Sequence, residues 1–245
     1  MRKIIFCLAG LLLSVSGFSQ ATADFGIWGG AAGYIGDIED NTLTQSSFPA
    51  LGAFFRYNFH RRTSVRAMFL TGKVAAEGPF QNMPDPWSFE KSVQDLSFQV
   101  EVNYLSYQIG NKKHSFTSYV MAGAGVAYYN YEADPAMLYR FNPRQIKGEN
   151  PIDESVIAPT FPFGMGFKFN VGKRLGLGVE YQMRKIFDDR LDNLDDPLAH
   201  YNSEGKAVTY SDFIHNNDWT GYLGLYVTYN VFLGTKSCPA YDKKR

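Results

Sequence analysis

The sequence contains little cysteine and, beyond its first residues, no long apolar run. Two of its 245 residues are cysteines, Cys7 and Cys238. After residue 20, no stretch supplies the roughly 20 consecutive apolar residues that a membrane-spanning helix needs. The chain therefore has no candidate spanning helix after its N-terminal segment. If that segment and Cys7 are removed, no intrachain disulfide is possible, and Cys238 is either a free thiol or an intermolecular bridge.

An excess of positive charge and the common ligand-binding motifs are also absent. Lys plus Arg and Asp plus Glu number 24 each, so nothing indicates a nucleic-acid partner. The four histidines form no close metal-ligand pair. The acidic run 188–196 lacks the glycine and spacing of a calcium loop, which favours a solvated loop. The sequence predicts no metal and no cofactor.

Catalytic motifs are missing as well. No nucleophile elbow is present, and the histidines and acids cluster outside the regular segments. We therefore expect a protein that is not an enzyme. The alternative is a barrel hydrolase of the lipid-A-modifying or phospholipase kind.

The N-terminus has the order of a secretory signal peptide. Arg2 and Lys3 precede an apolar run over residues 4–15, and small or polar residues follow. Cleavage after Ser19 fits the small-x-small rule, and cleavage after Ala23 fits it too. We expect residues 1–19 to be removed on export, with residue 23 as the later limit.

Aromatic residues and period-two alternation dominate the rest of the chain. Aromatic residues make up 16% of it, with 20 Phe and 16 Tyr. From Phe161 to Val171, apolar residues alternate with Pro, Gly, Lys and Asn, and the same period recurs from Leu175 to Met183. Alternation of this kind predicts strands with one apolar face. We expect eight strands, at residues 24–36, 49–59, 63–73, 95–109, 115–131, 159–171, 174–184 and 219–232.

The second face of these strands distinguishes a membrane barrel from a soluble sandwich. It carries Gly, Asn, Gln and Ser, with charges of both signs at Arg56, Glu101, Lys168, Glu180 and Arg184. A narrow barrel turns its apolar face to lipid and fills its lumen with small and polar side chains. The sequence thus predicts an all-β, eight-stranded antiparallel outer-membrane barrel over residues 20–232. A soluble all-β sandwich is the alternative.

Long and tight connections alternate along the chain. Outer-membrane barrels have short periplasmic turns and long extracellular loops, so the tight connections are predicted to be periplasmic. These turns are basic and contain no acid, whereas the long loops lean acidic. A basic periplasmic rim suits anionic lipid or an acidic partner, although ordinary solubility patterning is the alternative. Its residues are Arg61, Arg62, Lys112, Lys113, Lys173 and Arg174.

The chain continues past the last expected strand as a tail over residues 233–245. The tail contains Cys238, and Lys236, Pro239 and Tyr241 lie close to it. Strand parity places the tail in the periplasm, an oxidising compartment. We predict that these residues bind a partner and that Cys238 forms an intermolecular disulfide. A disordered end is the alternative.

Several short motifs follow one another in a fixed order along the chain. They are Gly33-Tyr34-Ile35-Gly36-Asp37, Ile109-Gly110-Asn111-Lys112-Lys113-His114, Phe163-Gly164-Met165-Gly166-Phe167-Lys168, Glu180-Tyr181, Arg184-Lys185-Ile186-Phe187-Asp188-Asp189, Leu191-Asp192, Asn217-Asp218-Trp219 and Cys238-Pro239. Taken in this order, they resemble a known family, the PorG-type outer-membrane barrels of the Bacteroidota type IX secretion system. The sequence departs from that family's pattern at Ile186 and Arg190, where Thr and Tyr are expected.

The resemblance implies a structural role without catalysis. Barrels of this family associate with a periplasmic ring formed by the lipoprotein PorK and its partner PorN, and they tie that ring to the outer membrane. We therefore expect PorK-like and PorN-like partners and the surrounding outer-membrane lipid. The alternative is an envelope-stabilising or adhesive barrel unrelated to secretion.

Overall fold

A computed structural model describes six stretches of the chain, residues 22–35, 48–78, 87–133, 152–193, 200–208 and 218–232. The predicted signal peptide and the tail with Cys238, Lys236, Pro239 and Tyr241 lie outside the described residues. Among the described residues, no helix is long and apolar enough to cross a membrane.

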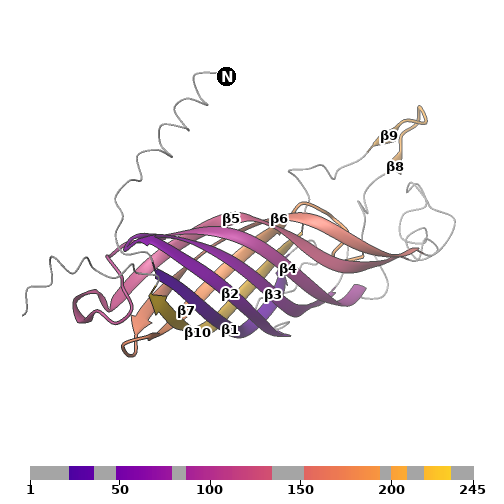
Figure 1. Cartoon of the computed structure of the whole chain (residues 1–245). Coiled ribbons are helices and arrows are strands. Elements are labelled where there is room, and N and C mark those ends of the chain that lie inside the picture. Colours follow the sequence, from indigo (N-terminus) through magenta and orange to yellow (C-terminus); the bar gives the residue numbers. More distant parts are fainter. Residues whose placement is uncertain are drawn as a thin grey trace, which may run out of the picture.

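Eight strands form a closed antiparallel barrel, as the sequence predicts (Figure 1). Each strand pairs with its neighbour in the chain, and β10 pairs with β1 from Thr22↔Phe232 to Ile35↔Trp219, which closes the sheet. Closure satisfies the backbone of every strand inside the barrel, which a lipid environment requires. The strands are β1 (Thr22–Ile35), β2 (Phe48–His60), β3 (Thr63–Gly78), β4 (Trp87–Asn103), β5 (Phe116–Ala133), β6 (Ile152–Asn170), β7 (Leu175–Ile186) and β10 (Trp219–Phe232).

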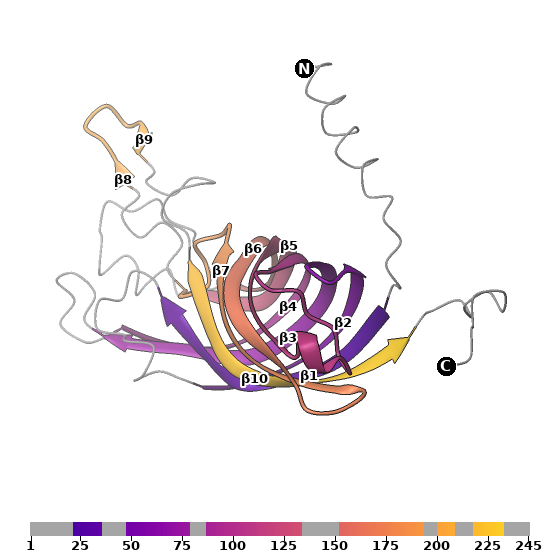
Figure 2. The same ribbon diagram turned by 90° about the vertical axis from the view of Figure 1, so that its left-hand side faces the viewer.

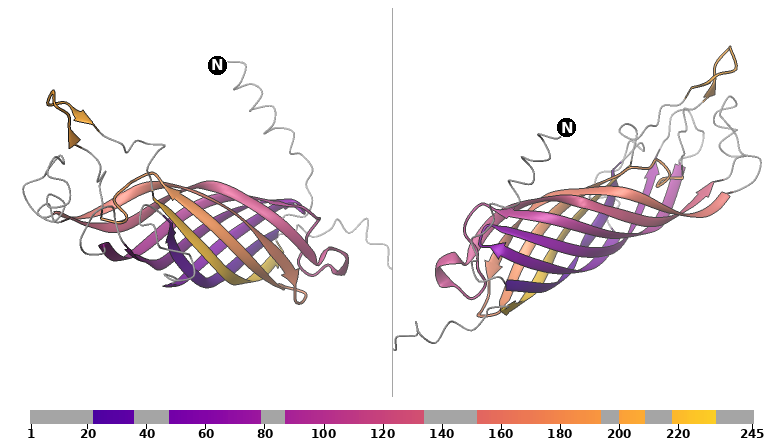
Figure 3. Two further views of the ribbon diagram at one scale, coloured as in Figure 1. Left: turned by 180° about the vertical axis from the view of Figure 1, so that it is seen from behind. Right: turned by 45° about the horizontal axis from the view of Figure 1, so that its top comes forward.

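The barrel has two different ends, which the views of Figure 3 show from both sides. At one end lie the short connections β2–β3 and β6–β7, together with the start of β1 and the end of β10; we call it the turn end. At the other end, the loop end, lies a small hairpin of β8 (His200–Tyr201) and β9 (Ala207–Val208), which the sequence did not predict. In transmembrane barrels the short turns are the periplasmic ones.

An apolar belt covers the outside of the barrel. Every barrel strand contributes exposed apolar side chains to it, and Ile27, with 72% of its surface exposed, is an example. Exposure on this scale all around a sheet is unfavourable in water and is expected where the outer face meets lipid. Members of the belt are Phe25, Ile27, Leu51, Phe55, Phe69, Leu96, Phe98, Val100, Val120, Val126, Met165, Phe167, Leu177, Val179, Leu223, Leu225 and Val227.

The hairpins β3–β4 and β5–β6 continue beyond this belt at the loop end. Pairing extends to Gly78↔Trp87 in one and to Ala133↔Ile152 in the other. On β4 the polarity of the two faces is reversed in this extension: the polar residues Ser88 and Glu90 are exposed, and Phe89 is buried. Outside the membrane the outer face meets water, so polar residues point outward and apolar residues point inward.

Three expected strands had wrong boundaries for physical reasons. The strand expected at 63–73 continues to Gly78, the one expected at 95–109 occupies 87–103, and the one expected at 159–171 begins at Ile152. The extensions toward the loop end were missed because they lack an outward apolar face. The late part was included because apolar residues continue to alternate through Tyr107 and Ile109, although the chain there has left the sheet.

Candidate functional site

Charged side chains fill the half of the lumen toward the turn end, which we call the charged half. Glu101 of β4 lies at its centre and is fully buried. Its Oε2 is 2.8 Å from Nε of Arg56 and 2.5 Å from Nζ of Lys168, and its Oε1 is 3.2 Å from Nε of Arg66. These cations come from β2, β6 and β3. One carboxylate of β4 therefore links side chains of four strands.

The charges of the charged half balance, apart from Lys91 and the aspartates buried near the loop end. Arg66 reaches Glu180 at 2.6 Å, Arg56 reaches Asp24 at 3.5 Å, and Arg184 pairs with Asp95. Each of these side chains is at most 2% exposed. Unpaired charges are too costly to bury, so a packed lumen needs equal numbers of both signs. Four cations, Arg56, Arg66, Lys168 and Arg184, therefore face four anions, Asp24, Asp95, Glu101 and Glu180.

Aromatic and amide side chains complete the packing of this half. Tyr119 donates a hydrogen bond to Glu180, and its ring lies 4.3 Å from Nζ of Lys168. Gly178 stands opposite Tyr226, whose ring occupies the place where a Cβ would be. The alternating glycines of β7 thus leave room for side chains of the neighbouring strand β10 and of the link between β4 and β5.

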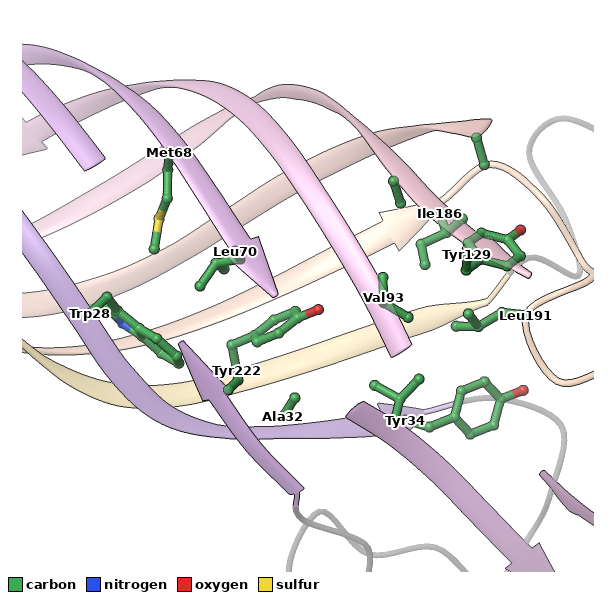
Figure 4. Packing of buried hydrophobic residues seen from close by; sticks show 14 of the residues in the cluster. Trp28, Ala32, Tyr34, Met68, Leu70, Val93, Tyr129, Ile186, Leu191 and Tyr222 are labelled. Atoms are coloured by element: carbon green, nitrogen blue, oxygen red, sulfur yellow. The ribbon is translucent and has the colours of Figure 1, made fainter. Parts of the chain in front are cut away.

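Mainly apolar and aromatic side chains fill the rest of the lumen, toward the loop end, and we call this part the apolar half (Figure 4). Two cations border its aromatic rings: Arg184 lies over Tyr222, and Lys91 over Tyr129. Trp28 and Leu70 are completely buried, and Trp28 packs edge-on against Tyr222 with ring centroids 6.3 Å apart. Side chains buried to this degree pack against one another and occupy the lumen. The larger members are Trp28, Tyr34, Met68, Leu70, Val74, Phe89, Val93, Tyr129, Tyr131, Ile186, Leu191 and Tyr222.

The turn end is closed by the link between β4 and β5, residues 104–115, which we call the plug. The link lies across the barrel in the view of Figure 2. Ile109 is buried, and Tyr107 donates its backbone N–H to the carbonyl of Arg61 at 3.0 Å. Asn170 Nδ2 donates to the carbonyl of Gln108 at 2.8 Å. A cavity of about 20 Å³ remains between the plug and Asp24, enough for one water molecule.

The three connections of the turn end form one basic surface, the basic turns, made of residues 60–63, the plug and residues 171–174. The Arg61 carbonyl also accepts from Asn103 Nδ2 at 3.1 Å. Gly110, at φ 84°, packs so closely on the Lys173 carbonyl that a Cβ would lie 2.6 Å from its oxygen. The contacts fix the turns against one another. The surface exposes all six residues predicted for the basic rim: Arg61, Arg62, Lys112, Lys113, Lys173 and Arg174.

At the loop end, residues 187–193 fold over the lumen and form what we call the cap. Leu191 is completely buried and its backbone N–H donates to Asp218 Oδ2 at 3.0 Å. The Tyr34 hydroxyl lies 2.7 Å from Asp218 Oδ1 and 3.1 Å from Asp192 Oδ2. Three of the motifs that carry the family resemblance, those around Tyr34, Leu191-Asp192 and Asp218, therefore meet at this place.

A second set of contacts holds the cap to β4, β5 and β6. Arg190 pairs with Asp188 at 2.7 Å and with Glu154 at 2.8 Å, and Lys91 Nζ donates to the Arg190 carbonyl at 2.9 Å. Burial by itself would raise the pKa of the Asp188 carboxyl, but hydrogen bonds from Arg190 and Tyr129 outweigh burial and hold this pKa below its usual value.

The structure places the predicted lumen charges together and adds others that the sequence analysis missed. Arg56, Glu101, Lys168, Glu180 and Arg184 are all buried in the lumen, as predicted. Arg66 was missed because its inward neighbours Met68 and Leu70 are apolar, and Asp95 because it stood at an expected strand boundary. Alternation from the outward residues Val65, Ala67 and Phe69 was the signal that could have identified Arg66.

The acidic run after β7 differs from the expectation of a solvated loop. Asp189 and Asp192 are buried, and Asp188 is only partly exposed. Asp192 accepts a hydrogen bond from Tyr34, 158 positions away, and Asp188 accepts one from Tyr129, 59 positions away, so local composition does not reveal these contacts. Within the described part of the chain, no three His, Cys, Asp or Glu side chains form a group that could hold a metal ion.

The closed pairing, the apolar belt and the charge-balanced lumen define an eight-stranded transmembrane β-barrel of the outer-membrane type. More particularly, the chain belongs to the family described as Domain of unknown function (DUF6089), which matches residues 2–241. No curated protein matches the sequence significantly.

Solved outer-membrane proteins share the general architecture. Neisserial surface protein A is 9% identical with a TM-score of 0.47, covering 87% of this chain and 99% of that chain. The attachment invasion locus protein Ail of Yersinia pestis is 10% identical with a TM-score of 0.46, covering 87% and 100%. A major outer membrane protein of Thermus thermophilus is 13% identical with a TM-score of 0.44, covering 85% and 99%. The assignment to the transmembrane class rests on the pairing and belt of this chain.

Proposed function

We propose that this barrel is a non-catalytic anchor, which holds a periplasmic assembly at the outer membrane through its basic turns. The observation that carries the proposal is the closure of the lumen at both ends. The plug blocks the turn end, the cap covers the loop end, and paired charges and apolar side chains fill the space between them. A barrel packed in this way is not built to pass solutes. Its function is then expected to depend on binding a partner at its exposed surface.

The basic turns are the surface that best fits an assembly below the membrane. Six exposed cations share one end, their turns contain no acid, and backbone hydrogen bonds hold two of the turns in register. Such a surface attracts a partner with an acidic face, raises the association rate and fixes orientation. Together with the sequence resemblance, it supports the ring of PorK-like and PorN-like subunits of the type IX secretion system as the partner.

Co-purification from cells that carry a type IX secretion system tests this function. The full-length barrel, tagged within its tail, should recover the ring subunits. The double substitution Lys112→Glu and Lys113→Glu reverses two exposed charges on the plug and should reduce this recovery at least about tenfold. Lys206→Glu reverses one exposed charge on the loop-end turn between β8 and β9; it is the control for position and should recover the subunits normally.

The outcomes separate docking from the alternative function. If a correctly folded wild-type barrel never recovers ring subunits, the secretion role is wrong and the envelope-stabilising or adhesive role takes its place. If ring subunits are recovered equally by both charge reversals, the ring does not dock on the basic turns.

The sequence-based prediction for Cys238 concerns the same docking. A bridge to a membrane-anchored ring subunit would turn a weak tail contact into a long-lived one, because both sulfurs are held near the membrane. Cells lysed with a thiol-blocking reagent should give a heavier band on a non-reducing gel, absent in Cys238→Ser. Complete alkylation of Cys238 in a monomeric band would contradict the bridge.

A further inference from the structure

The lipid-facing belt contains a hollow of about 640 Å³ over β1, β2 and β3. Its floor is made by two small outward-facing residues, Ala53 of β2 and Ala67 of β3. Ala53 lies opposite Phe69 across the strand pair, and Phe55 lies opposite Ala67. The two phenylalanines therefore lie diagonally to each other on the outer face of the strand pair, and the small alanine side chains leave a depression between them.

The hollow ends beside a cation of the basic turns. Tyr229 of β10 lines the hollow, and its hydroxyl accepts a hydrogen bond from Arg174 Nη1 at 2.9 Å. Leu175, the residue after Arg174, lines the hollow as well. Arg174 is exposed, and a guanidinium carries five donors in a planar fork that matches a phosphate. The hydrogen bond to the Tyr229 hydroxyl orients the guanidinium of Arg174 and leaves its positive charge unneutralised.

We propose that the hollow and Arg174 together form a binding site for one anionic glycerophospholipid of the surrounding leaflet. An acyl chain lies over Ala53 and Ala67, between Phe55 and Phe69, and the phosphate binds Arg174. The hollow is part of the belt that faces hydrocarbon, and Arg174 lies at the turn end, where the belt gives way to polar turns. Basic pockets at this level recognise lipid head groups. The site does not depend on the docking of a ring.

The charge around the site favours an anionic lipid over a zwitterionic one. Arg61 and Arg62 end the β2–β3 hairpin whose strands form the floor, and Lys173 precedes Arg174. The turns contain no acid that would compete for these cations. Each cation near the surface adds attraction for anionic head groups, on the order of 1 kcal/mol.

Native mass spectrometry of the full-length barrel in detergent tests the site. The protein is mixed with equal amounts of phosphatidylglycerol and phosphatidylcholine, and the retained lipids are counted. The wild-type barrel should keep one phosphatidylglycerol in preference to phosphatidylcholine. Arg174→Gln should lower phosphatidylglycerol retention about tenfold, to the level of phosphatidylcholine, because charge-assisted bonds to phosphate are lost. Lys206→Gln makes the same charge change on the exposed hairpin at the loop end and should leave retention unaltered.

A second pair of variants separates the apolar hollow from the charge. Ala67→Phe fills the floor and should reduce the retention of both lipids. Ala124→Phe adds the same side chain at an exposed belt position of β5 and should not. Equal retention by Arg174→Gln and Lys206→Gln, or by Ala67→Phe and Ala124→Phe, overturns the proposal. So does a wild-type dimer that Ala67→Phe abolishes, because the hollow then holds a second copy of the chain. Circular dichroism confirms that each variant is folded.

Discussion

The charged half and the apolar half of the lumen occupy the same barrel but are filled by opposite chemistry. In the charged half, Glu101 touches three cations from three other strands. In the apolar half, Trp28 and Leu70 are held by contacts with other apolar side chains. The charged half is stable only if its few positive and negative groups are paired, whereas the apolar half is stable if its side chains fill the available volume.

This difference teaches how a narrow barrel closes itself. Apolar packing works at the loop end because the extended hairpins and the cap add covering residues such as Phe89 and Leu191. Toward the turn end, long charged side chains from four strands meet at Glu101 and pair. The two fillings should respond differently to substitution.

The largest effect is expected from removing the central anion. Glu101→Gln leaves Arg56, Arg66 and Lys168 buried without their shared carboxylate, and breaking a buried ion network costs about 3–5 kcal/mol. The free energy of unfolding, measured by urea titration in lipid vesicles, should fall by this amount. Glu90→Gln breaks the exposed Lys73–Glu90 pair instead and should cost at most about 1 kcal/mol.

A double substitution at Glu101 and Lys168 tests whether the buried positive and negative charges are coupled. Adding Lys168→Met to Glu101→Gln removes one cation together with the anion, so the double variant should be more stable than the sum of the two single losses predicts. Strict additivity would show that these charges are not coupled and would weaken the contrast between the two halves.

In the apolar half, the expected cost is that of an empty volume. Leu70 is completely buried and packs against Gly52, where no neighbouring side chain can fill the gap. Leu70→Ala should lower the free energy of unfolding by about 2–4 kcal/mol. Adding Lys168→Met should lower it further by the amount that Lys168→Met costs alone, because the halves act independently; a large coupling energy would contradict their separation.

The smallest effect concerns the cap and depends on pH. The folded-state pKa of Asp188 lies below the unfolded value of about 3.9, so its ionised form stabilises the fold at neutral pH. This contribution disappears as pH falls from about 4 through the folded-state pKa. Asp188→Asn should therefore destabilise the barrel modestly at pH 7, and its difference from the wild type should shrink toward pH 3.

Asn193→Ala is the control for this pH dependence. Asn193 belongs to the same cap, has a φ of 67° and accepts a hydrogen bond from the Glu132 N–H, but it does not titrate. Its cost should stay constant over the same range. A constant difference for Asp188→Asn as well would show that its charge does not stabilise the cap.

The sequence was sufficient to predict the barrel, its strand number and most of the lumen. The reason is local: a residue such as Lys168 between Phe167 and Phe169 must point inward if its neighbours face lipid. The cap was not predictable, because Tyr34 and Asp192 are far apart in the chain. The plug was not either, since Tyr107 and Ile109 keep the alternation of a strand while crossing the mouth of the barrel.

The central claim is that the lumen is closed from the plug to the cap, so that the barrel serves as an anchor and not as a channel. Planar lipid bilayers containing the pure, folded protein measure this directly. The account predicts no stable conductance, because buried ion pairs and packed aromatic side chains fill the lumen. Reproducible single-channel steps, seen in independent preparations and abolished when the protein is left out, would contradict it.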